Sequence, residues 1–596
     1  MRPTTVTGEV RPGRHGERGT VTKRLIPAEL ALLVGRSAEP ALAKASSSPQ
    51  EAMPVIAPRL LTDLIDRAVD HHGDRPAVDF MGRIWTYREI GELSLRAARG
   101  LQDLGVTPGT RVGLCLPNTP YFVICYFAIL RIGGVVVTFN PLYTERELEH
   151  QIRDSGTKFM IASDLALSLP KLGGLIGSTP LSRVVVCPIA DVLPALKRSA
   201  YRLLKRKEIA QTPHDLRYVQ FAELIVRDAS PDAVALDPHD LAVLQYTGGT
   251  TGVPKGAMLS HANLTANSAQ MIAHVGHMPA VQERTLGVLP LFHVFALTTV
   301  LNHSVDTAAE MILLPRFEMK SFLDTVRRTK PTQFFGVPTL YAALNNAALR
   351  GGFDHVRVCI SGGAPLPLEV RQNFEARTGV NVVEGYGLSE ASPIIACNPI
   401  EGVVKDNSCG PAFPGTTLEI RDMADPLRVL RTGERGEVCA RGPQVMKGYW
   451  QRPAESEASF IYGALRTGDI GYLDEDGYLF LVDRITDLII CSGYNVYPRT
   501  IESALYEHSS VAEAVVIGIP DAYRGESPKA FVALHEGHAL DEETLFAFLR
   551  ERLSKIEMPS EIEFRESLPK TVVGKLSKKE LVAEKAARRD AAGVAP

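Results

Sequence analysis

The chain has 596 residues, of which 45% are hydrophobic and 22% charged, so it is long enough to form several folding units with large apolar cores. This composition excludes a small binding module and, for most of the chain, extended disorder. Lys and Arg total 65 against 68 Asp and Glu, and the resulting net charge of -3 makes nucleic acid an unsuitable partner.

The first 54 residues contain no strong periodic pattern, and we expect a disordered or dispensable tail over 1–54. Residues 25–34 are mostly apolar, but Pro27 and Glu29 interrupt them, which does not fit a signal peptide. The eight cysteines lie far apart, without CxxC pairs or neighbouring histidines at metal-ligand spacing. The cysteine pattern therefore favours a reducing, cytoplasmic location over a disulfide framework or a zinc site.

From about residue 59, short β-branched runs alternate with helical patterns, which indicates βαβ units and a parallel sheet. The first five runs predict strand, helix, strand, helix and strand over 111–117, 122–133, 135–139, 145–156 and 158–164. Residues 121–139 could pass for a membrane span. Because Arg131 and Gly133–Gly134 divide them, we expect a buried helix followed by a strand.

Residues 193–207 place six basic side chains around Leu193, Leu196, Ala200 and Leu203 at helical spacing. One interpretation is a helix that lies on an anionic membrane surface. The other is a solvated helix packed on its own protein. Peripheral contact with the inner face of the membrane is therefore a secondary prediction.

Further strand patterns follow, and their texture changes along the chain. Apolar runs of the parallel type recur at 284–290, 311–316, 332–338, 356–363 and 381–387. Past residue 415 the runs at 416–422, 436–442 and 478–484 are separated by glycines in the manner of hairpins. A small unit follows, with elements at 501–508, 513–520, 529–536 and 545–553.

These patterns predict an α/β protein with a large N-terminal region and a small C-terminal domain. The N-terminal region, 55–484, combines several parallel-sheet subdomains with an antiparallel extension. A hinge over 485–487 leads to a mobile α+β domain over 488–596.

The most informative segment is 246–261, YTGGTTGVPKGAMLSH. It combines amides that can turn toward an anion with hydroxyl donors and one positive charge, which describes a polyphosphate cradle. Pro254 precedes the lysine and Gly256 follows it, so the segment is not a Walker A loop. The cradle residues are Thr247, Gly248, Gly249, Thr250, Thr251, Gly252 and Lys255.

Five further segments carry candidate site residues, although each alone would pass for a turn, a core element or a surface. They are LPLFHVF at 289–295, SGGAPL at 361–366, EGYGLSEASP at 384–393, RTGDIG at 466–471 and LPKTVVGKLSKK at 568–579. A tyrosine between glycines can lie flat beside a base, and a carboxylate such as Glu390 can reach a hydrated Mg²⁺. Asp469 has two oxygens that can accept hydrogen bonds from both hydroxyls of a ribose. His293 can be either a core residue or a site residue.

Together and in this order, the motifs resemble those of the adenylate-forming superfamily, which includes acyl-CoA ligases, luciferases and the adenylation domains of peptide synthetases. The resemblance runs from about residue 59 to 585 and is greatest to bacterial long-chain fatty acid:CoA ligases. It implies an enzyme that uses ATP and Mg²⁺ to form acyl-AMP from a fatty acid, and then transfers the acyl group to CoA.

The resemblance also implies residue roles. It assigns the nucleotide pocket to Gly362, Gly363, Ala364, Glu384, Gly385, Tyr386 and Gly387, with Tyr386 stacked on adenine. Asp469 would bind the ribose with Arg484 as its companion, and Glu390 and Thr251 would hold Mg²⁺. Lys575 is the expected catalytic lysine. His293 is expected beside the acyl site, and Gly493 on the path of the pantetheine arm.

Two positions depart from the pattern of the superfamily: Thr486 in the hinge, where Asp or Lys is common, and Thr500, where a carboxylate is usual. They leave open a fatty acyl-AMP ligase that delivers to a carrier protein, and a CoA ligase for another acid, such as an aryl acid, is also open. A nucleotide-binding regulator without turnover is disfavoured, because Lys575, Glu390 and Asp469 are all present. Acyl chain length and a homodimer stay undecided.

Overall fold

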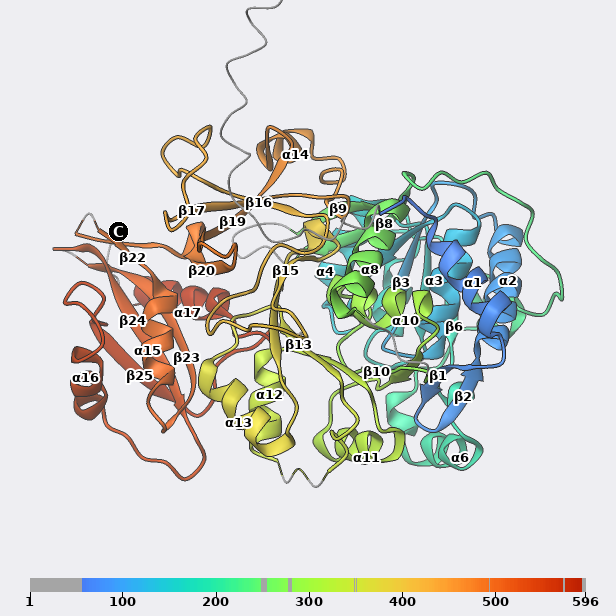
Figure 1. Ribbon diagram of the computed structural model, residues 1–596. Coiled ribbons are helices and arrows are strands. Elements are labelled where there is room, and N and C mark those ends of the chain that lie inside the picture. The colour runs from blue at the N-terminus through green and yellow to red at the C-terminus, as the bar shows by residue number, and fades with distance from the viewer. Residues whose placement is uncertain are drawn as a thin grey trace, which may run out of the picture. The chain divides into compact units, whose positions relative to one another are not determined.

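The computed structural model describes residues 56–247, 254–276, 281–347, 349, 351–492, 494–521, 523–571 and 574–591. Within these residues the strands form four sheets, and helices connect most of the parallel strands (Figure 1).

The first sheet has seven strands in the order β7-β6-β5-β3-β4-β8-β9. All neighbours pair in parallel except the last two, which form an antiparallel hairpin. The strands are β3 Arg111–Cys115, β4 Val135–Thr138, β5 Phe159–Ser163, β6 Arg183–Cys187, β7 Tyr218–Gln220, β8 Leu241–Thr247 and β9 Lys255–Ser260.

The second sheet has eight strands in the order β15-β14-β13-β12-β10-β11-β1-β2. Its six central strands are parallel, and an antiparallel strand lies at each edge. The strands are β1 Pro76–Phe80, β2 Arg83–Thr86, β10 Arg284–Gly287, β11 Glu310–Leu313, β12 Gln333–Gly336, β13 Val358–Gly362, β14 Val383–Gly387 and β15 Ile394–Cys397.

The helices of this region follow local signals in the sequence. Helix α4 begins after Thr144, whose hydroxyl and the Glu147 carboxylate form a capping box, and it ends at Gly156 with a φ of 65°. The other helices of eight or more residues are α1 Leu61–His72, α2 Tyr87–Asp103, α3 Pro120–Arg131, α6 Ala195–Leu204, α8 His261–Val275, α11 Met319–Thr329, α12 Pro338–Asn345 and α13 Leu368–Thr378; α4 spans Glu145–Ser155.

The shorter helices lie mostly in the connections. They are α5 Leu169–Leu175, η1 Ile189–Val192, η2 Arg206–Glu208, α7 Phe221–Leu224, α9 Val294–Ala296, η3 Leu297–Asn302, α10 His303–Asp306, η4 Ser389–Ala391 and α14 Pro453–Ala458. Of these, η3 is a π-helix directly after the His293 segment.

The apolar stretch at 121–139 forms a buried helix and a strand, as predicted. Eleven of the twelve residues of α3 are buried, and all four residues of β4 are buried in the centre of the first sheet. Among the described residues, no helix has the length and apolar character needed to cross a membrane. All eight cysteines are buried, with free thiols.

The third sheet is antiparallel, which confirms the predicted extension. Its strands are β16 Thr417–Arg421, β17 Gly436–Arg441, β18 Phe460–Ile461, β19 Ala464–Leu473 and β20 Leu479–Arg484. A single turn of 3-10 helix, η5 Ile485–Asp487, follows β20 directly.

The C-terminal elements form a small α+β unit with apolar cores of its own. Figure 1 shows its long hairpin β23–β24 with α15, α16 and α17 around it. The elements are β21 Ile489–Cys491, β22 Tyr494–Val496, α15 Pro498–Tyr506, β23 Val511–Asp521, β24 Gly525–Leu534, α16 Glu542–Arg550, β25 Glu561–Arg565 and α17 Lys578–Ala591.

Candidate active site

The two ends of the predicted polyphosphate cradle, Thr247 and Lys255, lie at the end of the β8–β9 hairpin. Thr247 and Lys255 are the last residue pair of this hairpin, so the polypeptide between them starts and ends at one point of the sheet edge. Gly248, Gly249, Thr250, Thr251 and Gly252 lie outside the described residues, as does Gly493. The structure therefore places the two ends of the cradle.

Glu390 and Lys255, which are far apart in the sequence, meet at the side chain of Tyr449. The Tyr449 hydroxyl donates a hydrogen bond of 2.7 Å to Oε1 of Glu390. The ammonium group of Lys255 lies 5.1 Å from the centre of the Tyr449 ring, within the range of a cation–π interaction. The predicted metal-binding carboxylate and the predicted phosphate-binding lysine thus share one neighbour.

Glu390 is suited to an Mg²⁺ ion that arrives with the phosphates of ATP. Tyr449 engages Oε1 of Glu390, and an ionised carboxylate can accept about four hydrogen bonds or ligands in all. Among the described residues, no three His, Cys, Asp or Glu side chains cluster closely enough to hold a metal. Mg²⁺ commonly binds through one or two carboxylates together with substrate phosphates and water, which fits this arrangement.

Tyr386, Asp469 and Arg484 form a connected group. The Tyr386 hydroxyl donates to Oδ2 of Asp469 at 2.5 Å, and Nε of Arg484 donates to Oδ1 at 3.1 Å. Asp469 on β19 and Arg484 on β20 are directly opposite each other in the antiparallel register, which brings their side chains together. Burial and the Asp469 carboxylate raise the pKa of Tyr386 well above its ordinary value.

Of the glycines assigned to the nucleotide pocket, three lie on β13 and β14, and Gly363 follows β13 directly. Gly362 and Gly387 leave little or no room for a larger side chain. A Cβ at Gly362 would lie 3.1 Å from the Phe295 ring, and one at Gly387 would lie 2.1 Å from the carbonyl oxygen of Pro393. Gly362 and Gly385 are a register pair, so two separate motifs meet across one strand boundary. Ala364 follows in the connection after β13 and is half-buried.

The side chain of Glu384 points into the protein. Its Oε2 accepts a hydrogen bond of 3.4 Å from the Leu366 amide, and its Oε1 lies 3.6 Å from the Cys409 thiol. Burial raises the pKa of this carboxyl, against the opposing effect of Arg499. In this structure the Glu384 carboxylate organises the pocket wall.

Lys575 reaches the nucleotide pocket from the C-terminal unit. Its Nζ lies 3.2 Å from the position that a Cβ of Gly363 would occupy. The preceding residue, Gly574, accepts a hydrogen bond of 2.6 Å from the Thr339 hydroxyl through its carbonyl oxygen. Burial lowers the pKa of Lys575 to about 8; the positive charge of Arg484 adds to this effect, and Asp469 opposes it.

His293 lies at the N-terminus of α9, where its Nδ1 accepts a hydrogen bond of 3.3 Å from the Phe295 amide. Burial lowers the pKa of His293 to about 3, and the charge of Lys575 contributes in the same direction. The imidazole is therefore neutral at physiological pH.

No motif marks Tyr449, and no sequence pattern identifies Thr339, a candidate acyl-pocket residue, as a partner of Gly574. Tyr449 lies in a segment without secondary-structure periodicity, and Thr339 occupies the first turn of α12, beside the buried strand β12. Their roles depend on contacts with Glu390 and Gly574, which only the folded chain brings near. The folded structure is therefore needed to identify the contacts of Tyr449 and Thr339.

Comparison with known proteins identifies the family of the chain. Residues 65–450 match the family described as AMP-binding enzyme, and residues 500–575 match the AMP-binding enzyme C-terminal domain. A long-chain-fatty-acid–CoA ligase of Bacillus subtilis is 40% identical over 560 residues, which cover 92% of this chain and 98% of that protein. The enzyme of the same name from Salmonella typhimurium is 37% identical over 536 residues, or 87% of this chain and 94% of that protein.

Solved structures share the fold. ATP-bound MatB from Rhodopseudomonas palustris has a TM-score of 0.77 at 30% identity, over 88% of this chain and 98% of that one. The anthranilate CoA ligase AuaEII in complex with anthranoyl-AMP has a TM-score of 0.78 at 26% identity, over 90% of this chain and 98% of that one. The chain belongs to the AMP-binding enzyme family, as its motifs predicted.

Proposed function

We propose that this protein is an AMP-forming ligase that joins a long-chain fatty acid to CoA through a fatty acyl-AMP intermediate. The observation that carries the proposal is the position of Lys575 beside Gly363, at the wall of the pocket that contains Tyr386 and Asp469. The fatty-acid substrate is supported by the relatives that carry this activity in their names.

In the first step, a carboxylate oxygen attacks the α-phosphorus of ATP, and the bond to pyrophosphate breaks. A carboxylic acid with a pKa of about 4 is already ionised at pH 7, so the step needs no general base. The barrier is the approach of two anions. Lys575 can neutralise the carboxylate and the α-phosphate, while Lys255 and the cradle amides hold the departing pyrophosphate.

Bound Mg²⁺ would supply further charge neutralisation on the phosphates, held on the protein side by Glu390 and Thr251. We assign the adenine to the face of Tyr386 and the two ribose hydroxyls to Asp469, supported by the hydrogen bonds that fix this carboxylate in place. Because His293 is neutral, it can accept or donate a hydrogen bond near the acyl carboxylate without adding charge.

In the second step the CoA thiol attacks the acyl carbonyl of acyl-AMP, a thioester forms, and AMP leaves. The resemblance implies that the C-terminal domain rotates about 485–487 between the steps, which withdraws Lys575 and brings Gly493 to the pantetheine path. Thr486 is exposed in the hinge and donates a hydrogen bond of 3.2 Å to the Asp487 carboxylate next to it. Its short side chain leaves the hinge without an ion pair at this position.

A pyrophosphate-release screen tests this function. Short-, medium- and long-chain fatty acids and aryl acids are each supplied with Mg²⁺ and ATP, with and without CoA. We expect the highest kcat/KM with long-chain acids and stoichiometric acyl-CoA when CoA is present. Acyl-AMP that accumulates and reacts only with a carrier protein would favour the acyl-AMP ligase, and a preference for aryl acids would replace the fatty-acid assignment.

We further propose that α6 brings the enzyme to an anionic membrane surface from the cytoplasmic side. No residue of α6 is buried, and Leu196, Leu203 and Leu204 are 89%, 78% and 77% exposed. The lysine and arginine that follow the helix, Arg206 and Lys207, are exposed as well. Exposed leucines beside basic side chains are typical of helices that lie in the membrane interface.

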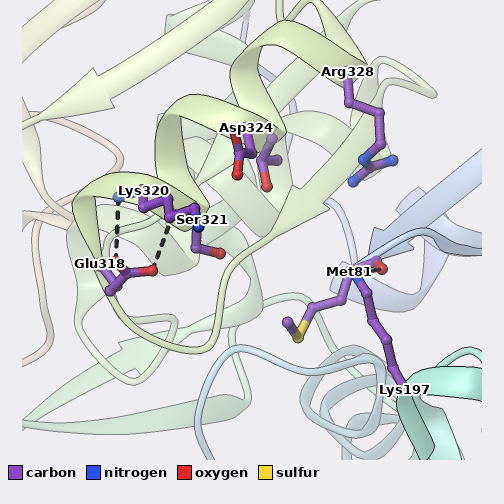
Figure 2. A pocket seen from close by; sticks show the side chains of 8 residues that line it. Met81, Lys197, Glu318, Lys320, Ser321, Asp324 and Arg328 are labelled. Carbon is purple, nitrogen blue, oxygen red and sulfur yellow. Dashed lines mark hydrogen bonds between the residues drawn. The ribbon is translucent and has the colours of Figure 1, made fainter. Parts of the chain in front are cut away.

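Contacts along the length of α6 fix it to the protein, while Leu196, Leu203 and Leu204 stay exposed. Figure 2 shows Lys197 extended toward Met81, whose carbonyl oxygen accepts a hydrogen bond of 2.8 Å from the ammonium group. Arg202 and Lys205 form ion pairs with Asp191 and Glu208. The pocket drawn there lies between Met81, Lys197 and the side of α11 that runs from Glu318 to Arg328. At the start of α11 the Glu318 carboxylate accepts hydrogen bonds from the Lys320 and Ser321 amides.

Vesicle flotation tests the membrane proposal. The protein should float with vesicles rich in phosphatidylglycerol and not with pure phosphatidylcholine, and salt should weaken the binding. Arg206→Glu with Lys207→Glu, or Leu203→Gln with Leu204→Gln, should each abolish flotation. Reversal of two exposed lysines elsewhere, Lys158→Glu with Lys330→Glu, is the matched control. Equal flotation of all variants would contradict the proposal. Light scattering of the same proteins without vesicles distinguishes a monomer from a homodimer.

A further inference from the structure

We propose that Tyr449 is a positioning residue that holds Glu390 and Lys255 in the geometry needed for MgATP. The inference rests on the proposed adenylation at this site but not on the identity of the acid. Three sets of contacts, described in turn, support it: those of the backbone around residue 449, those of the hydroxyl and those of the ring.

The backbone of residues 446–450 is held on both sides. Toward β9, the Lys447 amide donates a hydrogen bond of 3.1 Å to the carbonyl oxygen of Met258. The Met258 amide in turn donates one of 2.9 Å to the carbonyl oxygen of Gly448. Toward η4, the Met446 amide donates to the carbonyl oxygen of Glu390 at 2.7 Å. The segment therefore connects the strand that begins with Lys255 to the turn that contains Glu390.

The close approach of this segment to its neighbours is built into the sequence. A Cβ at Gly448 would lie 2.9 Å from the Ser456 hydroxyl, and the φ of Gly448 is 137°. The same hydroxyl accepts a hydrogen bond of 2.8 Å from the Tyr449 amide. Gly448 and Ser456 thus fix the point from which the Tyr449 side chain leaves the backbone.

The side chain then contacts both functional groups through different parts of the ring system. Its hydroxyl binds Oε1 of Glu390 at 2.7 Å, and its face lies 5.1 Å from Nζ of Lys255. A tyrosine hydroxyl has an ordinary pKa of about 10 and is therefore protonated at neutral pH. A protonated hydroxyl can restrict the carboxylate to one rotamer and still leave acceptor sites for the metal or its water ligands.

Two substitutions separate the contributions of the hydroxyl and the ring. Tyr449→Phe keeps the ring near Lys255 and removes the hydrogen bond to Glu390. We expect the Mg²⁺ concentration at half-maximal pyrophosphate release to rise about tenfold, because hydrogen bonds to charged groups are the stronger ones. Tyr449→Leu removes both interactions, and the KM for ATP should rise further at saturating Mg²⁺.

Tyr478 offers a matched control in the same region. Its hydroxyl donates to the carbonyl oxygen of Val403 at 2.7 Å, and Lys405 lies 4.5 Å from its ring centre. Tyr478→Phe therefore removes a hydroxyl hydrogen bond, here to a neutral carbonyl oxygen, from a lysine-contacted tyrosine that we place outside the nucleotide site. It should leave the Mg²⁺ requirement and the KM for ATP unchanged.

A binding measurement without any fatty acid separates this inference from the proposed function. Titration of MgATP, followed by the fluorescence of Trp450 in a Trp85→Phe background, should show weaker binding in Tyr449→Phe at low Mg²⁺ and recovery at high Mg²⁺. Trp85 and Trp450 are the two tryptophans of the chain. An Mg²⁺ dependence equal to that of the parent in both assays would overturn the role of the hydroxyl, even if the ligase activity is confirmed.

Discussion

Burial of Lys575 disfavours the charged ammonium group that its proposed role requires. The protein removes its ammonium group from water and places it within the field of Arg484, and both effects favour the neutral form. The phosphates of ATP would restore the charged form. The site is thus arranged to gain electrostatic interaction when the nucleotide arrives.

Loss of this side chain should separate the two half-reactions. We expect Lys575→Ala to lower acyl-AMP formation from fatty acid and ATP by about a hundredfold or more, because the charge that lets two anions meet is gone. Conversion of supplied acyl-AMP to acyl-CoA should be nearly unchanged. Single-turnover assays of each step measure both rates, and an equal loss in the two steps would contradict the assignment.

The lowered pKa of Lys575 also predicts a pH limit. The charged form prevails below about pH 8 and is lost as the pH rises through that value, so kcat/KM for acyl-AMP formation should fall above about pH 8. In Lys575→Arg the guanidinium stays charged, and the remaining activity should continue to higher pH. A descending limb at the same pH in both proteins would assign it to another group.

At the scale of the elements, the N-terminus of α12 and the loop before α17 form one contact that holds Lys575 in place. The Thr339 hydroxyl donates to the carbonyl oxygen of Gly574, and a Cβ at Gly574 would lie 3.1 Å from that hydroxyl. The φ of Gly574 is 82°, a conformation that favours glycine. The lysine is therefore presented by a fixed turn.

Thr339→Val should weaken this contact with little change in shape. Removal of one hydrogen bond worth about 1 kcal/mol predicts a loss of about fivefold in acyl-AMP formation. The second step should be unchanged or faster, since the contact stabilises only the arrangement used in the first step. Thr339→Ser keeps the hydroxyl and should restore the rate. If the valine and serine variants behave alike, the hydrogen bond has no role.

Most of the strands and helices were predictable because their signals are local. The alternation of apolar runs gave β3, α3, β4, α4 and β5 in order, and the glycine-separated runs after residue 415 gave the antiparallel sheet. The order of strands within each sheet was not predictable. β1 pairs with β11, for example, because helices far apart in the sequence share one core, and no local pattern encodes that contact.

The same distinction applies to the site. The resemblance to the superfamily implied that Asp469 and Arg484 act together, and the two residues lie opposite each other on neighbouring strands. The contacts of Tyr449 could not be predicted from the sequence. Its partners Glu390 and Lys255 depend on how the 446–450 segment packs against β9 and η4. Glu384 belonged to a recognisable motif, yet its carboxylate faces the Cys409 thiol, which the motif does not specify.

At the scale of the whole molecule, the proposed cycle needs the C-terminal domain to occupy two positions. The structure describes the one in which Lys575 lies beside Gly363, at the proposed nucleotide pocket. Between the two regions the backbone passes through η5, whose first residue, Ile485, follows an extended Arg484 with a ψ of 142°. Rotation requires the backbone dihedrals of this turn to change.

Proline at the first residue of η5 should retain the described position and hinder the other. Ile485→Pro fits here, because proline is favoured at the first position of a helical turn and requires an extended residue before it. We expect acyl-AMP formation to stay within about twofold of the parent, since the ring fixes φ in the range of a helical turn and Arg484 is already extended. Thioester formation should fall by about tenfold or more, because the second position needs a different φ there.

Ile485→Ala is the control for the lost side chain, which is 36% exposed, and it should leave both steps near the parent rates. The rates of the two half-reactions are measured separately, with acyl-AMP supplied for the second. Their ratio shows whether proline slows thioester formation selectively. A proline variant that slows both steps equally would mean that the turn is needed for folding or binding. One that slows neither would place the rotation at another point of the backbone.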